Sequence, residues 1–121
     1  MSPVVPHFEI LDERTSEGVD VVTVRGEIHL STAPRFRRRL ETIIDDGDGW
    51  VVLDLGAVEF IDSTGLSVLL GALRQVSQHK GRMALVCTNP TVLRLFEITS
   101  LDTTFDIQAD RAAAIASVAG N

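Results

Sequence analysis

The sequence is poor in cysteine and in basic residues, and each shortage excludes a class of protein. Its 121 residues include one cysteine, Cys87, so no disulfide can form within the chain. Cys87 ends an apolar run, which indicates a buried and inert thiol. Eleven lysines and arginines stand against seventeen acidic residues, giving a net charge of −6. This balance argues against nucleic acid as a partner, because duplex binding needs a surplus of basic side chains.

Long apolar runs are also missing. No stretch approaches the roughly 20 residues that a membrane-spanning helix needs. Residues 1–6 contain two prolines but no basic segment followed by an apolar core, so they do not resemble a signal peptide and are expected to be loose. We therefore expect a cytoplasmic protein that does not insert into a membrane.

Signatures of enzymes, metals and cofactors are absent as well. The glycines form neither a dinucleotide-binding fingerprint nor a phosphate-binding loop. His7, His29 and His79 lie far apart and have no metal-ligand spacing with Cys87. No Gly-x-Ser-x-Gly turn supports a catalytic triad, although sequence alone does not exclude one. The expectation is a protein that is not an enzyme and has no metal and no cofactor.

What the sequence does contain is an alternation of strand and helix patterns. The length fits one domain, residues 1–121, with a core at about 8–119. β-branched runs and helix start and stop signals predict, in order, strands at 8–12 and 19–25, a helix from 31–34 to about 44, a strand at 50–55, a helix at 63–78, a strand at 82–87, a helix from 89, a strand at 105–107 and a helix at 112–119. This order predicts an α/β fold: an opening hairpin, then a mixed and mostly parallel sheet of about four to five strands with about four helices packed on it.

One segment, residues 58–66, carries the best candidate for a site. An apolar stretch leads to Asp62, Ser63 and Thr64 at the start of a strongly amphipathic helix. A helix N-terminus offers unpaired N–H groups and a partial positive charge, and open α/β sheets place their sites at this edge. A phosphate on Ser63 would add a charge of about −1.5 to −2 that these N–H groups could hold. The same residues also fit an ordinary N-cap, which is the commoner role of such a motif, and the two roles are compatible.

These residues resemble a known family. Asp54-Leu55 followed by Phe60–Leu66 is similar to the central motif of STAS domains, found in the anti-sigma-factor antagonists of sporulation and stress responses. Gly26-Glu27-Ile28 with Ser31-Thr32-Ala33 resembles an earlier family motif, and Asn89–Glu97 resembles a later helix. The resemblance runs from about Val19 to Ile107, with the elements in the family order.

The resemblance implies a switch in protein binding. In the family, an anti-sigma factor that is a serine kinase phosphorylates the serine after the motif aspartate, and a phosphatase removes the phosphate. The unphosphorylated antagonist binds the kinase and releases the sigma factor. Ser63 falls on the phosphorylated position, with Thr64 as the alternative; Asp62 would orient the site and Gly65 would let the partner backbone approach. The expected partner-binding residues are Asp62, Ser63, Thr64, Gly65, His29, Ser31, Thr32 and Arg35.

Two other functions remain open with the same fold. The chain could be a small STAS subunit of a lipid-transport ATPase complex, or a regulatory domain that binds a nucleotide or another anion. The sequence does not identify the partner, and it leaves the oligomeric state open.

Two positions depart from the family pattern, and a basic cluster stands out in an otherwise acidic chain. His29 stands where the family often has aspartate; an exposed loop histidine is the simpler interpretation, and a pH-sensitive or anion-attracting site is the alternative. Ser100 stands where relatives often have a helix-ending glycine, which affects local backbone geometry. A basic cluster is either a solvated helix face or a docking surface for an acidic partner; it comprises Arg35, Arg37, Arg38 and Arg39.

Overall fold

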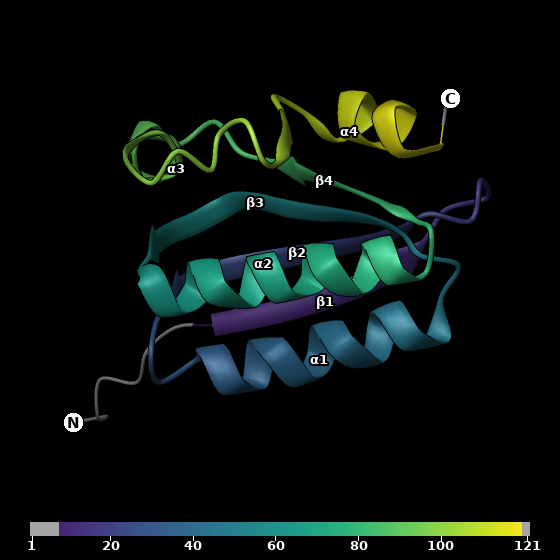
Figure 1. The fold of residues 1–121 in the computed structure, drawn as a ribbon, viewed down its shortest axis with the longest axis horizontal. Helices are drawn as coiled ribbons and strands as arrows, with labels where there is room; N and C mark the ends of the chain where they lie inside the picture. The colour runs from purple at the N-terminus through teal and green to yellow at the C-terminus, as the bar shows by residue number, and fades with distance from the viewer. Residues whose placement is uncertain (1–7, 120–121) are drawn as a thin grey trace.

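One twisted sheet separates two sets of helices in the computed structural model, which describes residues 8–119 (Figure 1). The elements in chain order are β1 (Phe8–Arg14), β2 (Asp20–Ile28), α1 (Ala33–Asp46), β3 (Trp50–Ile61), α2 (Ser63–Gln78), β4 (Arg82–Val86), α3 (Pro90–Ile98), β5 (Asp106–Gln108) and α4 (Arg111–Ala119). The predicted fold class is confirmed. The expectation that residues 1–6 are loose lies outside the described residues.

The five strands follow one another across the sheet in the order β1-β2-β3-β4-β5. β1 and β2 form the predicted hairpin, antiparallel from Phe8 opposite Gly26 to Arg14 opposite Asp20. Gly18 closes its turn at φ 85°, a conformation that glycine adopts without strain. β2 to β5 are all parallel, so the carboxyl ends of β2 and β3 meet at one edge.

β3 is longer than predicted and runs on through residues 56–61. Its pairing with β2 shifts register twice, between Thr23 and Arg25 and between Gly26 and Glu27. Such irregularities break the alternation of buried and exposed side chains on which a strand prediction depends. The prediction therefore stopped at Leu55, where the regular pattern ends.

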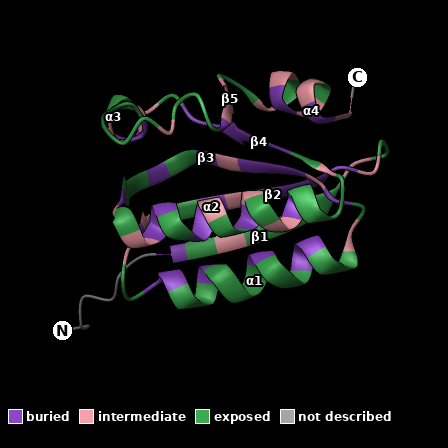
Figure 2. Cartoon of the chain, viewed as in Figure 1, coloured by how far each residue is buried: buried purple, intermediate pink, exposed green. Residues whose placement is uncertain are grey.

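The main core lies between the sheet and helices α1 and α2, with α3 at one end. Figure 2 shows buried positions recurring along the sides of α1 and α2 that face the sheet. Its largest fully buried side chains include Phe36, Phe96, Leu53 and Leu85. Cys87 is buried in this core, as predicted, and burial raises the pKa of its thiol. A smaller core on the other face of the sheet is covered by α4.

Arg111, the first residue of α4, joins this last helix to three strands. Its guanidinium donates to the Asp54 carboxylate at 3.0 Å, to the Thr23 hydroxyl at 2.7 Å and to the Glu13 carboxylate at 3.0 Å. These acceptors belong to β3, β2 and β1. Arg111 thus fixes the start of α4 across the sheet.

Lys80 and Gly81 follow the end of α2. The residue in the left-handed conformation is Lys80, at φ 58°, and not Gly81. The Gly81 N–H donates to the Val76 carbonyl at 2.9 Å and closes the helix. A Cβ at Gly81 would lie 1.9 Å from the Gly49 carbonyl oxygen, so glycine is needed here for a close backbone contact.

The end of α3 confirms that the serine at position 100 affects backbone geometry. Ser100 has φ 60°, its N–H donates to the Glu97 carbonyl at 3.0 Å, and the next N–H, of Leu101, donates to the Phe96 carbonyl at 2.8 Å. This pattern is a Schellman motif, whose left-handed position favours glycine. A side chain at that position strains the backbone.

We predict that Ser100→Gly stabilises the fold by about 0.5–1 kcal/mol, because glycine adopts this conformation without a clash involving Cβ. Urea unfolding followed by circular dichroism measures the change. Ser77→Gly, at an exposed helical position in α2, is the matched control. It should lower the urea concentration at the midpoint of unfolding. A fall in stability for Ser100→Gly would contradict the prediction.

Candidate functional site

The candidate site lies at the edge of the sheet where β2 and β3 end and α2 begins. The Asp62 N–H donates to the Ile28 carbonyl at 3.1 Å, across the ends of the two strands. This bond holds the start of α2 beside the loop between β2 and α1. Residues from positions 28–32 and 60–65 therefore meet at one end of the molecule.

Asp62, one of the residues that the sequence offered as a cap, is the N-cap of α2. Its backbone is extended, and its Oδ1 accepts the Gly65 N–H at 3.0 Å. Ser63 is the first helical residue and is exposed. Its carbonyl accepts the Ser67 hydroxyl, but its own hydroxyl makes no hydrogen bond to any residue within 8–119. Capping by Asp62 thus leaves the Ser63 hydroxyl accessible to another molecule.

The positive end of α2 lies beside this hydroxyl. The N–H groups of Ser63 and Thr64 precede the first intrahelical hydrogen bond and point out of the helix N-terminus. Thr64 is partly exposed, whereas Ser63 is exposed. The arrangement favours a negative group on Ser63 over one on Thr64.

Gly65 has a different role from the one expected. It is buried, and a Cβ there would lie 2.7 Å from Ile61 Cγ1 and 2.8 Å from Ile28 Cγ2. The missing side chain lets the first turn of α2 pack against the ends of β2 and β3. The close approach at Gly65 is therefore to the ends of the chain's own strands.

Thr32 also serves the chain's own structure. It is 8% exposed, and its hydroxyl donates to the Glu27 carbonyl at 2.8 Å and accepts the His29 N–H at 2.9 Å. It is the N-cap residue of α1 by position, but its side chain makes no capping bond. Thr32 sets the shape of the loop instead of offering a surface to a partner.

His29 is ordered within this loop and is not an exposed loop histidine. Its side chain is 20% exposed, and its ring lies 6.4 Å from the ring of Phe60 at the end of β3. Its Nδ1 accepts the Ser31 N–H at 3.1 Å, and its Nε2 lies 3.6 Å from Glu27 Oε1. Because Nδ1 is an acceptor, the neutral ring carries its proton on Nε2, facing the carboxylate. Ser31 itself is exposed.

Arg35 is not brought to Ser63. Its guanidinium lies over the ring of Phe8, 5.3 Å from the centroid, and donates to the Phe8 carbonyl at 3.4 Å. These contacts hold it on the β1 side of α1. Of the predicted set, the structure brings His29, Ser31, Asp62, Ser63 and Thr64 to one end, and it turns Arg35 away.

Two apolar residues of this end were missing from the predicted set. Leu30 is 74% exposed and Phe60 is 46% exposed, although most apolar side chains of the chain are buried. Leu30 stands between His29 and Ser31 in a predicted loop, and this was the one signal in the sequence. Exposed apolar side chains that flank a polar group are typical of binding surfaces for proteins.

Other classes of site were searched for in the described part of the chain. No group of three or more histidine, cysteine, aspartate or glutamate side chains within 8–119 is arranged to hold a metal ion. No helix in the same range combines the length and the apolar character needed to cross a bilayer.

We predict that Gly65→Ala destabilises the fold by about 1–3 kcal/mol, because its Cβ must displace Ile28 or Ile61. Thermal unfolding measures the effect. Gly71→Ala in the same helix is the matched control: a Cβ there meets no atom within 4 Å, so alanine should stabilise by up to about 1 kcal/mol. Equal effects of the two substitutions would contradict the packing role of Gly65.

Comparison with known proteins agrees with this geometry. The chain is 35% identical over 99 residues to the anti-sigma-B factor antagonist of Listeria monocytogenes, which covers 81% of this chain and 85% of that protein. It is 32% identical over 99 residues to the anti-sigma-B factor antagonist of Bacillus subtilis, covering 82% and 90% of the two chains. Neither relative is named as an enzyme.

Solved structures give the same result for the fold. The crystal structure of an anti-sigma factor antagonist from Mycobacterium paratuberculosis superposes with a TM-score of 0.85 at 32% identity, covering 93% of this chain and 94% of that one. The unphosphorylated anti-sigma factor antagonist SpoIIAA has the same fold, with a TM-score of 0.77 at 24% identity over 90% and 95% of the chains. The STAS domain model matches residues 11–114, and the chain belongs to the STAS domain family.

Proposed function

We propose that this chain is an anti-sigma-factor antagonist whose binding to an anti-sigma factor is switched by phosphorylation of Ser63. The observation that carries the proposal is the exposed Ser63 hydroxyl, which has no hydrogen-bond partner within 8–119, at the capped N-terminus of α2. The names of the relatives support the antagonist function. In this proposal the anti-sigma factor is itself the serine kinase, and a phosphatase resets the switch.

The unphosphorylated site suits a protein interface. Leu30 and Phe60 expose apolar surface beside Ser63, and a neutral hydroxyl can be buried against a partner if it finds a hydrogen bond there. The ordered loop around His29 and Thr32 presents these side chains without a large loss of conformational entropy on binding.

Phosphorylation would change the charge at the centre of this surface. A phosphate adds a charge of about −1.5 to −2, next to the carboxylate of Asp62. The free N–H groups of Ser63 and Thr64 would hold the phosphate on the chain. Burying such a charge without a partner costs several kcal/mol, whereas micromolar binding amounts to about 8 kcal/mol. The phosphorylated form is therefore expected to lose its partner.

The test compares substitutions at Ser63 in binding to the purified anti-sigma factor of the same organism, measured by calorimetry. Ser63→Glu should weaken binding by about 100-fold or more, because it places a carboxylate in the interface. Ser67→Glu, one turn later on the exposed side of α2, is the matched control for charge and should weaken it much less.

The kinase reaction is followed separately by mass spectrometry of the intact protein. Ser63→Ala should abolish the added phosphate, and Thr64→Ala should not. Unchanged binding by Ser63→Glu, together with no phosphate on the protein recovered from its own cell, would overturn the switch. Phosphate on Thr64 alone would overturn the assignment to Ser63.

A further inference from the structure

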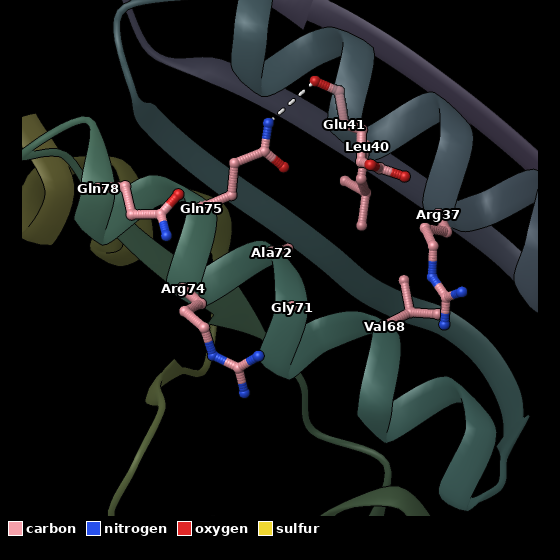
Figure 3. A pocket seen from close by; sticks show the side chains of 9 residues that line it. All are labelled: Arg37, Leu40, Glu41, Val68, Gly71, Ala72, Arg74, Gln75 and Gln78. Carbon is pink, nitrogen blue, oxygen red and sulfur yellow. Dashed lines mark hydrogen bonds between the residues drawn. The ribbon is translucent and has the colours of Figure 1, made fainter.

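A second surface lies along the outer side of the two parallel helices α1 and α2. Figure 3 shows a groove between them with Leu40, Val68 and Ala72 along its floor. All three floor residues are apolar and buried. Gly71 lies on the α2 side, and Arg37 and Arg74 lie at the rim.

The glycine in this groove has no role in the fold. Gly71 is exposed in the middle of α2, and a Cβ added there would meet no heavy atom within 4 Å. A glycine inside a helix costs about 0.5–1 kcal/mol relative to alanine. In the same helix, Gly65 is required by packing, whereas no atom of residues 8–119 lies close enough to require a glycine at position 71. A missing side chain at an exposed position lets the backbone of another molecule come close.

The two arginines at the rim form no ion pair with any other residue that the structure describes. Arg37 and Arg74 are exposed and form no hydrogen bond or ion pair through their side chains with any residue of 8–119. In contrast, Arg39 in the same helix as Arg37 pairs with Asp12. In the view of Figure 3, Gly71 lies between the two guanidinium groups. Two free positive charges therefore border an apolar groove on a chain of net charge −6.

One acidic residue, Glu41, lines the groove with the two arginines, so the charged lining has a net charge of +1 (two positive charges and one negative). Glu41 lines it from α1 but forms no ion pair with either arginine. Gln75 donates to the Glu41 carbonyl at 3.2 Å and to the Asp45 carboxylate at 2.8 Å. These two bonds tie α2 to α1 at one end of the groove and leave the arginines free.

We propose that the groove between α1 and α2 binds an acidic amphipathic helix of a partner protein. The apolar side of that helix covers a narrow floor, because Leu40, Val68 and Ala72 are only 1%, 3% and 5% exposed. Its backbone crosses α2 at Gly71, and its carboxylates pair with Arg37 and Arg74, which are both exposed at the rim. Amphipathic helices of partner proteins commonly bind in apolar grooves of this kind. Charge complementarity at the rim selects an acidic one.

A second copy of this chain does not fit the groove. α2 has one charged residue, Arg74, and α3 has one arginine and one glutamate. α4 has a single arginine, and α1 has four arginines against three acidic residues. None of these four helices carries a net negative charge, so none offers a surplus of carboxylates to pair with Arg37 and Arg74.

This surface is separate from the site at Ser63. Gly71 follows Ser63 by eight residues, which is about 12 Å along a helix axis. The inference therefore does not rest on the proposed phosphorylation switch, and the two surfaces present different chemistry. One is a hydroxyl among apolar side chains, and the other is an apolar groove with two arginines.

The test uses the full chain labelled with ¹⁵N and a synthetic helical peptide of about 18 residues, with leucine along one face and glutamate elsewhere. Amide shifts should concentrate at Arg37, Gly71 and Ala72 on titration. The double variant Arg37→Glu/Arg74→Glu should weaken binding by about tenfold or more. Arg38→Glu/Arg94→Glu makes the same change in charge at exposed positions outside the groove, and it should weaken binding by less than about threefold.

Gly71→Ala separates binding from stability. We expect it to raise the midpoint of thermal unfolding. It should nevertheless weaken the binding of the peptide by about tenfold, because its Cβ blocks the approach of the peptide's backbone. Shifts confined to other surfaces, equal weakening by the two double variants, or unchanged affinity of Gly71→Ala would each overturn the proposal. A dimer in ultracentrifugation that Arg37→Glu/Arg74→Glu dissociates would also overturn it, in favour of a second copy.

Discussion

The site depends on how closely the first turn of α2 fits against the ends of β2 and β3. Two features set this fit: the bond from the Asp62 N–H to the Ile28 carbonyl, and the missing Cβ of Gly65 between Ile28 and Ile61. Because the helix is fixed at its start, Ser63 faces outward and its hydroxyl stays free. The same contact brings the loop with His29 next to Phe60. A shift of this turn would move every residue of the site together.

The sequence was sufficient for the order of the elements and for the cap of α2. Runs of β-branched and apolar residues such as 19–25 and 50–55 identify strands by local patterns alone, and Asp62 identifies a helix start by its side chain. The resemblance to the STAS family pointed further to Ser100, whose backbone is left-handed as a glycine position would be. These inferences succeeded because each depends on neighbours in the chain.

The errors have the opposite origin. Gly65 looks like a residue of exposed backbone at a helix start, but it is required by a contact with the ends of β2 and β3. Arg35 stands next to the site in sequence order, but the ring and carbonyl of Phe8, 27 positions away, hold its guanidinium. The extension of β3 depends on register shifts against β2. Contacts of this kind do not follow from local patterns.

The bonds of Arg111 also have a consequence for the growing chain on the ribosome. Its partner Glu13 lies 98 positions earlier, in the first hairpin, and Asp54 and Thr23 lie 57 and 88 positions earlier. Contacts so distant in sequence form only after most of the chain has been ordered. The hairpin and the first helices are synthesised long before α4, so the face of the sheet that α4 covers stays open to water until residues 111–119 have been synthesised. A chain that stops short of residue 111 would leave that apolar face exposed.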